Sequence, residues 1–239
     1  MPRMKRWVWI MGLWLVGIGH AMAMDVKSAE TLRYRLYWGP MSVGDAQLDY
    51  RANGDRYQIK AEVVDDSSLI DLHDVWQAEG RHTKARAFVP DVYKVVQAEN
   101  SYRADKTMVF DRKAGKVIYT NRRDAADKVD ALPLSDARDV LSAVYAWRLV
   151  NEADVSKPAQ IPMVSMKREV VLERKVGVKD RVQIGGQKRD AWRVEMRVIK
   201  NGKPSKDTWT VFVSDDAHRV PLKIVAKTKF GTFNAILKP

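Results

Sequence analysis

The chain of 239 residues contains no cysteine. Disulfides, thiol nucleophiles, thiolate metal sites and a lipid-modified N-terminal cysteine are therefore excluded. Beyond the first two dozen residues, no apolar run approaches the ~20 residues that a membrane-spanning helix needs. A fold built by this sequence must be stabilised by packing and backbone hydrogen bonds alone.

Motifs of the common catalytic classes are also missing. The sequence has no GxSxG or SxxK serine motif, no HExxH or HxH pattern and no glycine-rich phosphate loop. Its best polar cluster is Asp71, His73 and Asp74, where alternation places Asp71 and His73 on one strand face. The cluster lacks metal-ligand spacing, and a polar turn explains it more simply. We therefore predict no catalytic residue, no metal site and no cofactor.

One long apolar run does occur, at the N-terminus. Three basic residues within positions 1–6 precede an apolar stretch from Trp7 to Gly19, and Ala21-Met22-Ala23 follows. This order predicts a cleavable secretory signal peptide over residues 1–23, whereas an uncleaved anchor would need a longer run. We expect an exported protein, located in the periplasm of a Gram-negative bacterium and not membrane-spanning after cleavage.

Basic residues exceed acidic ones, and the formal net charge is +12. Removing the three basic residues of the signal peptide lowers it to +9. Such a charge favours anionic neighbours, for example phospholipid headgroups or cell-wall polymers. Because the positive residues are dispersed and no nucleic-acid-binding motif occurs, we predict no nucleic-acid partner.

Residues 24–239 are expected to form a single β-rich domain. Apolar and polar residues alternate along most of this chain, for example over 32–38 and 194–198, and turn residues such as Asn53-Gly54 separate the runs. The pattern predicts a curved antiparallel sheet, or a partly open β-barrel, of about nine to twelve strands. Charges of both signs on the second strand face argue against a barrel that spans a membrane.

One segment, about 136–150, has helical spacing instead. Ser135 or Asp136 is expected to cap its first turn, and Arg148 suits its C-terminal end. We predict one α-helix that packs against the concave side of the sheet. The apolar residues that carry this prediction are spaced three or four apart: Val140, Leu141, Val144, Tyr145 and Leu149.

Three patches of the sequence occur in a recognisable order. They are Tyr37–Gly44, Asp139–Arg148 and a C-terminal set that runs from Trp209 through Val213-Ser214-Asp215-Asp216 and Arg219-Val220-Pro221 to Lys229-Phe230-Gly231-Thr232. Together they resemble the bacterial family called domain of unknown function 3108. The resemblance implies exported envelope proteins of mainly β structure, and it implies no established activity.

Seven residues of these patches are expected to have structural roles: Gly44, Asp139, Arg148, Asp215, Arg219, Pro221 and Gly231. Gly44 is predicted to let a strand bend or another chain approach closely, and Pro221 to begin a strand. The two charged helix residues of the set are predicted to meet Asp215 or Arg219 in a buried polar network.

Large aromatic residues suggest a binding function. If these residues line a cavity, they would form an apolar pocket at the mouth of a curved sheet. The alternative is that they are ordinary core residues. The residues predicted to line this pocket are Trp38, Tyr145, Trp147 and Trp209.

The leading hypothesis is therefore a non-catalytic protein that binds or chaperones a hydrophobic or amphiphilic envelope component, such as a lipid. A periplasmic protein–protein adaptor that uses a sheet edge or the basic face is the second hypothesis. The third is a hydrolase of cell-wall polysaccharide, which requires Asp71, His73 or Asp215 to converge in a cleft.

Overall fold

A computed structural model of the chain describes six stretches of residues: 28–65, 71–83, 88–123, 130–149, 154–166 and 168–239. The predicted signal peptide, residues 1–23, lies outside them. Over these stretches the alternating runs form β-strands, because alternation lets one face of each strand be buried while the other stays in water.

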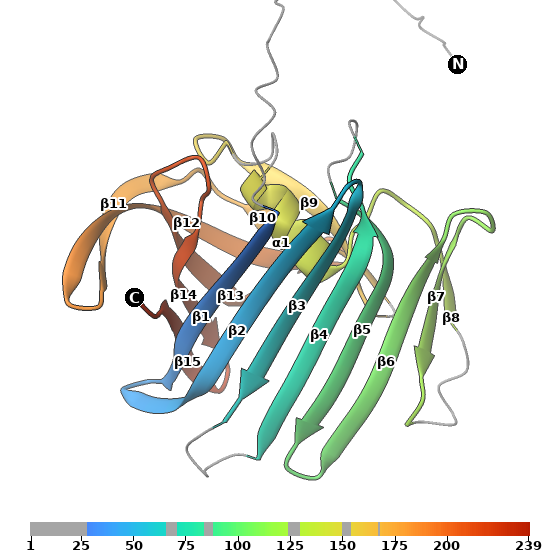
Figure 1. The fold of residues 1–239 in the computed structure, drawn as a ribbon, viewed down its shortest axis with the longest axis horizontal. Coiled ribbons are helices and arrows are strands. Elements are labelled where there is room, and N and C mark those ends of the chain that lie inside the picture. Colours follow the sequence, from blue (N-terminus) through green and yellow to red (C-terminus); the bar gives the residue numbers. More distant parts are fainter. Residues whose placement is uncertain (1–27, 66–70, 84–87, 124–129, 150–153, 167) are drawn as a thin grey trace, which may run out of the picture.

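Eight strands in sequence order form the first part of the sheet, which we call the N-terminal wall. It is a meander in which each strand pairs antiparallel with the next (Figure 1). Its strands are β1 (Ala29–Trp38), β2 (Met41–Asn53), β3 (Arg56–Val64), β4 (Leu72–Arg81), β5 (Val89–Glu99), β6 (Tyr102–Asp111), β7 (Lys116–Asn121) and β8 (Asp130–Pro133).

Seven further strands form the C-terminal wall. They are β9 (Ala159–Ser165), β10 (Arg168–Arg174), β11 (Val178–Ile184), β12 (Gln187–Lys200), β13 (Lys203–Ser214), β14 (Pro221–Thr228) and β15 (Gly231–Leu237). Fifteen strands are thus described, more than the nine to twelve expected. The difference arises because β8 has only four residues and because the long β12 pairs with β10 along one half and with β11 along the other.

The first and last strands of the fold join the two walls into one sheet. β1 pairs antiparallel with β15, so that Tyr34 lies opposite Leu237 and Trp38 opposite Phe233. The sheet curves until the walls face each other, but it is not closed into a barrel, since β8 and β9 remain at its two ends (Figure 1). The expected curved antiparallel sheet with one helix is confirmed.

The single helix of the described residues, α1 (Val140–Leu149), connects β8 to β9 and lies on the concave side of the sheet. Leu141 and Tyr145 pack into the core of the N-terminal wall, whereas Ala143 and Trp147 pack into the core of the C-terminal wall. A helix buried on two sides is apolar nearly all round, which explains why its sequence shows no narrow apolar stripe.

The helix begins later than the sequence predicted. Arg138 forms a parallel β-bridge with Met163, and the Val164 N–H donates to the Arg138 carbonyl over 2.8 Å. Residues held in this bridge cannot be helical, so the cap is Asp139 and not Ser135 or Asp136. Val140, expected on the buried side, is 37% exposed.

Candidate functional site

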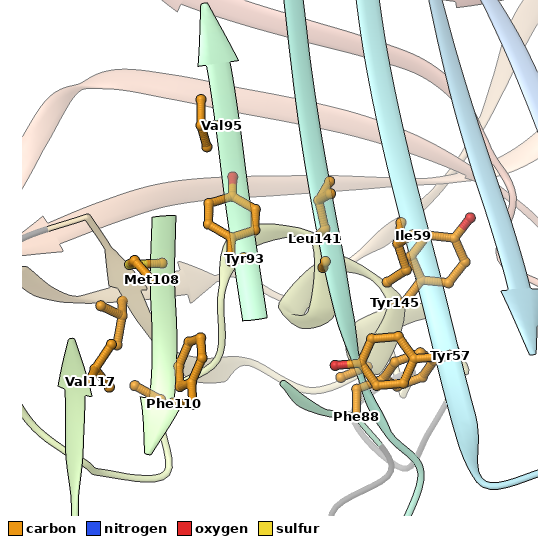
Figure 2. Packing of buried hydrophobic residues seen from close by; sticks show 14 of the residues in the cluster. Tyr57, Ile59, Phe88, Tyr93, Val95, Met108, Phe110, Val117, Leu141 and Tyr145 are labelled. Carbon is orange, nitrogen blue, oxygen red and sulfur yellow. The ribbon is translucent and has the colours of Figure 1, made fainter. Parts of the chain in front are cut away.

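The concave face of the sheet has two ends that differ in what covers them. At one end, which we call the filled end, α1 packs over strands of both walls. There the Tyr57 and Phe88 side chains are about 1% exposed and Tyr145 is fully buried. Figure 2 shows these three rings grouped beside the helix. The filled end is therefore ordinary close-packed core.

At the other end, which we call the open end, the same alternation leaves an apolar surface that α1 does not reach. A groove of about 260 Å³ lies here, between the strands that join the two walls. Its apolar lining residues are half-buried rather than buried: Leu36, Val43, Val63, Leu72, Ile224, Ala226, Phe233 and Ala235. Tyr37, Asp65 and Asn234 complete the lining. We refer to this hollow as the groove.

Two larger hollows lie over β2, β3 and β4, with volumes of about 520 and 360 Å³. Both include Arg51, Gln58 and Glu79 in their lining, and all three side chains are exposed. Charged, solvated surroundings of this kind favour water over an apolar ligand, whereas the groove removes apolar side chains from water only in part. The groove is therefore the better candidate for binding.

A polar cluster lies next to the groove on the N-terminal wall. Asp74, opposite the groove residue Val63, is 2% exposed, and its carboxylate accepts the Gln97 amide over 3.0 Å. Lys106 Nζ donates to the Gln97 side-chain oxygen over 3.0 Å. Burial, together with the neighbouring Asp74, raises the pKa of Glu99. One side of the groove thus offers charged and hydrogen-bonding groups beside an apolar floor.

The structure separates the four predicted pocket residues into two pairs. Tyr145 and Trp147 lie on α1 in the filled end, where Tyr145 is fully buried and Trp147 is 3% exposed. Trp38 lies at the rim of the open end, 37% exposed and stacked on the groove residue Phe233 with ring centroids 6.0 Å apart. Trp209 is half-buried on β13, opposite the groove residue Ala226.

The N-terminal cap of α1 forms a short buried hydrogen-bond chain. Asp139 Oδ1 accepts the Ser142 N–H over 2.9 Å, and Oδ2 accepts the Ser142 hydroxyl over 2.5 Å. The Tyr57 hydroxyl lies 2.7 Å from Ser142 Oγ and can donate to it. Burial raises the pKa of Asp139 to about 6, although the hydrogen bonds from Ser142 act in the opposite direction. This chain ties α1 to β3.

The C-terminal end of α1 is held by a buried ion pair. Arg148, which is fully buried, donates to both carboxylate oxygens of Glu30 over 2.8 and 3.0 Å. Its Nε also donates to the Arg219 carbonyl over 3.2 Å, and the Tyr34 hydroxyl donates to the Pro221 carbonyl over 2.9 Å. Arg148 therefore meets Arg219, as the sequence suggested, but through the Arg219 backbone. Asp139, at the other end of the helix, belongs to the cap.

Asp215 lies apart from the helix, in the turn before β14. It pairs with Lys179 and accepts the Trp192 indole N–H over 2.7 Å. Lys179 holds the pKa of Asp215 below its ordinary value. Asp71 and His73 have other partners, since Asp71 pairs with Arg103 and His73 Nε2 lies 2.8 Å from Glu62. Within the described ranges, no group of three or more acidic or histidine side chains could hold a metal ion.

Two predicted glycines have conformations and surroundings that require glycine. Gly44 has φ +150°, and a Cβ there would lie 2.2 Å from the Val64 carbonyl oxygen. Gly231 has φ +118°, and a Cβ there would lie 2.8 Å from the Trp38 indole nitrogen. Gly44 thus permits the close approach of two chain segments beside the groove, and Gly231 makes room for Trp38.

A family comparison covers nearly the whole described chain. A profile of "Protein of unknown function (DUF3108)" matches residues 33–238. This chain belongs to that family. DUF3108 membership agrees with the resemblance seen in the sequence patches, and it assigns no chemistry to the groove. No curated protein matches the chain.

Sequence reasoning did not identify most residues of this site. The alternating pattern placed part of the groove lining on strands but did not predict a separate surface, and Glu30, the partner of Arg148, was not among the predicted residues. The alternation of Leu36, Val63 and Ile224 was visible, yet the same alternation marks the filled end.

Over the stretches that the structure describes, no helix is both long and apolar enough to cross a bilayer.

Proposed function

We propose that this DUF3108 protein binds and carries a hydrophobic or amphiphilic molecule of the cell envelope, with an apolar chain of the ligand lying in the groove. The observation that carries the proposal is the groove itself: a concave apolar surface on the open end that no described element of the chain covers. The free energy of the system falls when a ligand completes the removal of half-buried apolar side chains from water.

The size of the groove suits an acyl chain rather than a bulky ring system. Its volume of about 260 Å³ lies just under the range of roughly 300–1,000 Å³ that is typical of drug-sized ligands. Each methylene that the ligand buries contributes about 0.8 kcal/mol. A segment of a few methylenes would therefore supply useful affinity without covalent or polar contacts.

The neighbouring polar cluster supports an amphiphile rather than a plain hydrocarbon. Lys106 lies beside Gln97 and Tyr102, and its Nζ donates to both. A lipid head with phosphate, carboxylate or hydroxyl groups would find donors and acceptors here within reach of the apolar floor. The predicted signal peptide over residues 1–23 supports a location outside the cytoplasm, where such molecules have to be moved between membranes.

The test is native mass spectrometry of the protein purified without detergent, followed by solvent extraction and lipid analysis. We expect a reproducible bound mass in the range of a single amphiphile. Ala226→Trp places a large ring into the groove and is expected to abolish the bound mass and to weaken titration with a fluorescent long-chain fatty acid.

Val225→Trp is the matched control, because Val225 is the neighbouring residue of β14 and points to the opposite face of the sheet. It should retain both the bound mass and the fatty-acid affinity. Equal binding by Ala226→Trp and Val225→Trp, with both variants folded, would overturn the groove as the binding site. A bare mass and no fatty-acid binding in the unchanged protein would overturn the proposal and favour an adaptor.

A further inference from the structure

Two hairpin turns lie side by side at the open end, on either side of the strand pair that joins the walls. One connects β1 to β2 at Gly39 and Pro40, and the other connects β14 to β15 at Lys229 and Phe230. The Gly39 N–H donates to the Thr232 carbonyl over 2.9 Å. Figure 1 shows the β1–β2 turn at the end of the sheet away from α1.

These turns expose large apolar side chains. Trp38 is 37% exposed, Met41 47% and Phe230 68%. The Trp38 ring is held in place, since its indole N–H donates to the Phe230 carbonyl over 3.0 Å and its face stacks on Phe233. Phe233 also lines the groove. The exposed apolar group therefore continues directly into the groove.

Lysines surround this apolar group on the side of the C-terminal wall. Lys227 lies near the end of β14 and Lys229 in the β14–β15 turn, where Lys229 Nζ lies 4.7 Å from the centre of the Phe230 ring. The neighbouring β12–β13 turn adds three more, because β13 pairs with β14 so that Thr208 lies opposite Lys227. All five lysines are exposed: Lys200, Lys203, Lys206, Lys227 and Lys229.

None of these five lysines forms an ion pair with an acidic residue in the described part of the chain. Elsewhere on the sheet several basic side chains, such as Arg35, Lys175 and Arg197, pair with carboxylates. Five lysines without such an ion pair therefore lie beside the exposed apolar side chains. We call this surface, formed by Trp38, Met41, Phe230 and the five lysines, the docking tip.

We propose that the docking tip binds the surface of an anionic phospholipid bilayer. Aromatic side chains are favoured at the boundary of headgroups and acyl chains, because an apolar ring and a polar edge suit that boundary. Lysines near an anionic membrane surface each add about 1 kcal/mol of attraction, and their apolar stems can lie along the lipid. An apolar tip flanked on one side by lysines without ion pairs matches this surface in both chemistry and charge.

Docking through this tip would place the groove beside the bilayer, because Phe233, which lines the groove, stacks on Trp38 of the docking tip. An acyl chain could then pass between the membrane and the groove without crossing open water. The inference does not rest on the carrier proposal, since a protein that docks in this way need not carry a lipid. The two proposals are also tested by different measurements: vesicle binding tests membrane docking, and a bound ligand mass tests the carrier function.

The experiment is co-flotation of the purified protein with vesicles of phosphatidylglycerol and phosphatidylethanolamine, compared with vesicles of phosphatidylcholine alone. The mass of each preparation is measured so that the state of residues 1–23 is known and identical among variants. We expect binding to the anionic vesicles that is lost at high salt. Lys227→Glu with Lys229→Glu should weaken it about thirtyfold or more, at roughly 1 kcal/mol for each lost lysine contact and about 1.4 kcal/mol per tenfold.

The matched control is Lys188→Glu with Arg189→Glu, which makes the same change of charge near the opposite end of β12. It should bind as the unchanged protein does. Equal losses in the two double variants, or equal binding of the unchanged protein to both vesicle types, would overturn the proposal. The midpoint of unfolding, measured on each variant, separates a loss of binding from a loss of fold.

A second measurement uses the absence of cysteine, which makes a single introduced thiol unique. Phe230→Cys and Val178→Cys are each labelled with a polarity-sensitive fluorophore; Val178 is 52% exposed on β11 and lies outside the docking tip. We expect a blue shift of emission with anionic vesicles for the label at position 230 and none for the label at 178. An unchanged spectrum at 230 on bound vesicles would overturn the proposed orientation.

Discussion

The filled end and the open end of the concave face are made from the same strands and the same alternating pattern, yet they differ in burial. Tyr57 and Ile59, on β3 at the filled end, are about 1% exposed, whereas Val63, four residues further along the same strand face, is half-buried in the groove. The difference comes from α1, which covers only one end. Alternation produces an apolar face, and the covering element decides whether that face becomes core or binding surface.

The two ends also differ in how polar groups are satisfied. At the filled end, Asp139 and Arg148 enter the core only with hydrogen-bond partners that connect the helix to β3 and β1. At the open end, Gln97, Glu99 and Lys106 of the polar cluster remain half-buried, although Asp74 is buried. Buried polar groups therefore hold the helix in position at one end, while those at the other remain available to a ligand.

The difference in burial between the two ends is tested most directly by replacing one phenylalanine with alanine at each end. Phe88→Ala, at the filled end, is expected to lower the free energy of unfolding by about 3–5 kcal/mol, because it leaves a cavity in close-packed core. Phe233→Ala, in the groove, should cost only about 1 kcal/mol, since that side chain is only partly buried in the folded protein. Denaturant unfolding measures both. Equal losses would contradict the difference between the ends.

Removal of the buried charge pair should have the next largest effect. Arg148→Ala removes the two-pronged ion pair of Glu30, whose side chain is only 17% exposed, and we expect a loss of about 3 kcal/mol. Arg148→Met combined with Glu30→Leu should recover part of this loss, because both charges of the buried pair are then gone. Thermal or denaturant unfolding of both variants provides the measurement. A double variant that is less stable than Arg148→Ala would show that the charge itself is required.

The buried cap should make stability depend on pH in a defined direction. The pKa of Asp139 is about 6 in the folded protein and near 4 in an unfolded chain. The contribution of protonated Asp139 to the free energy of unfolding is complete below about pH 4. It is lost as the pH rises towards 6, because Asp139 loses its proton at a lower pH in the unfolded chain than in the folded protein. The expected decrease is about 2–3 kcal/mol.

Asp139→Asn removes this titration and keeps an oxygen for the Ser142 N–H. Carboxylates with lowered pKa values, such as Glu62 and Glu195, make the free energy of unfolding change with pH in the opposite direction. The informative quantity is therefore the difference in unfolding free energy between the unchanged protein and Asp139→Asn at each pH. A difference that stays constant between pH 4 and 6 would contradict the raised pKa.

The smallest effects are expected for two glycines at the open end. Gly44→Ala should cost about 1–3 kcal/mol, because its Cβ would collide with the Val64 carbonyl oxygen. Gly39→Ala also places alanine at a positive φ, +56°, but nothing lies within 4 Å of its Cβ, so we expect about 1 kcal/mol. Unfolding midpoints of Gly44→Ala and Gly39→Ala separate the effect of the collision, which only Gly44→Ala has, from the effect of the positive φ, which both variants share.

The helix illustrates how local patterns and tertiary contacts share control of the fold. Its existence followed from apolar spacing within the segment, and its place on the concave side followed from the need to bury that apolar face against the sheet. Its first residue did not, since the bridge between Arg138 and Met163 involves a strand that begins about twenty residues later. A contact of that kind leaves no signal near the helix itself.

By itself, the sequence determined the mainly β character, the single helix, the turn glycines and membership of the DUF3108 family, because each depends on local pattern or on ordered motifs. Only the tertiary structure decided that β1 pairs with β15, that Glu30 meets Arg148, and that α1 fills one end of the concave face. The physical reason is the range of the interaction. Alternation specifies which side of a strand is apolar, but the curvature of the whole sheet and the length of one helix decide what that side contacts.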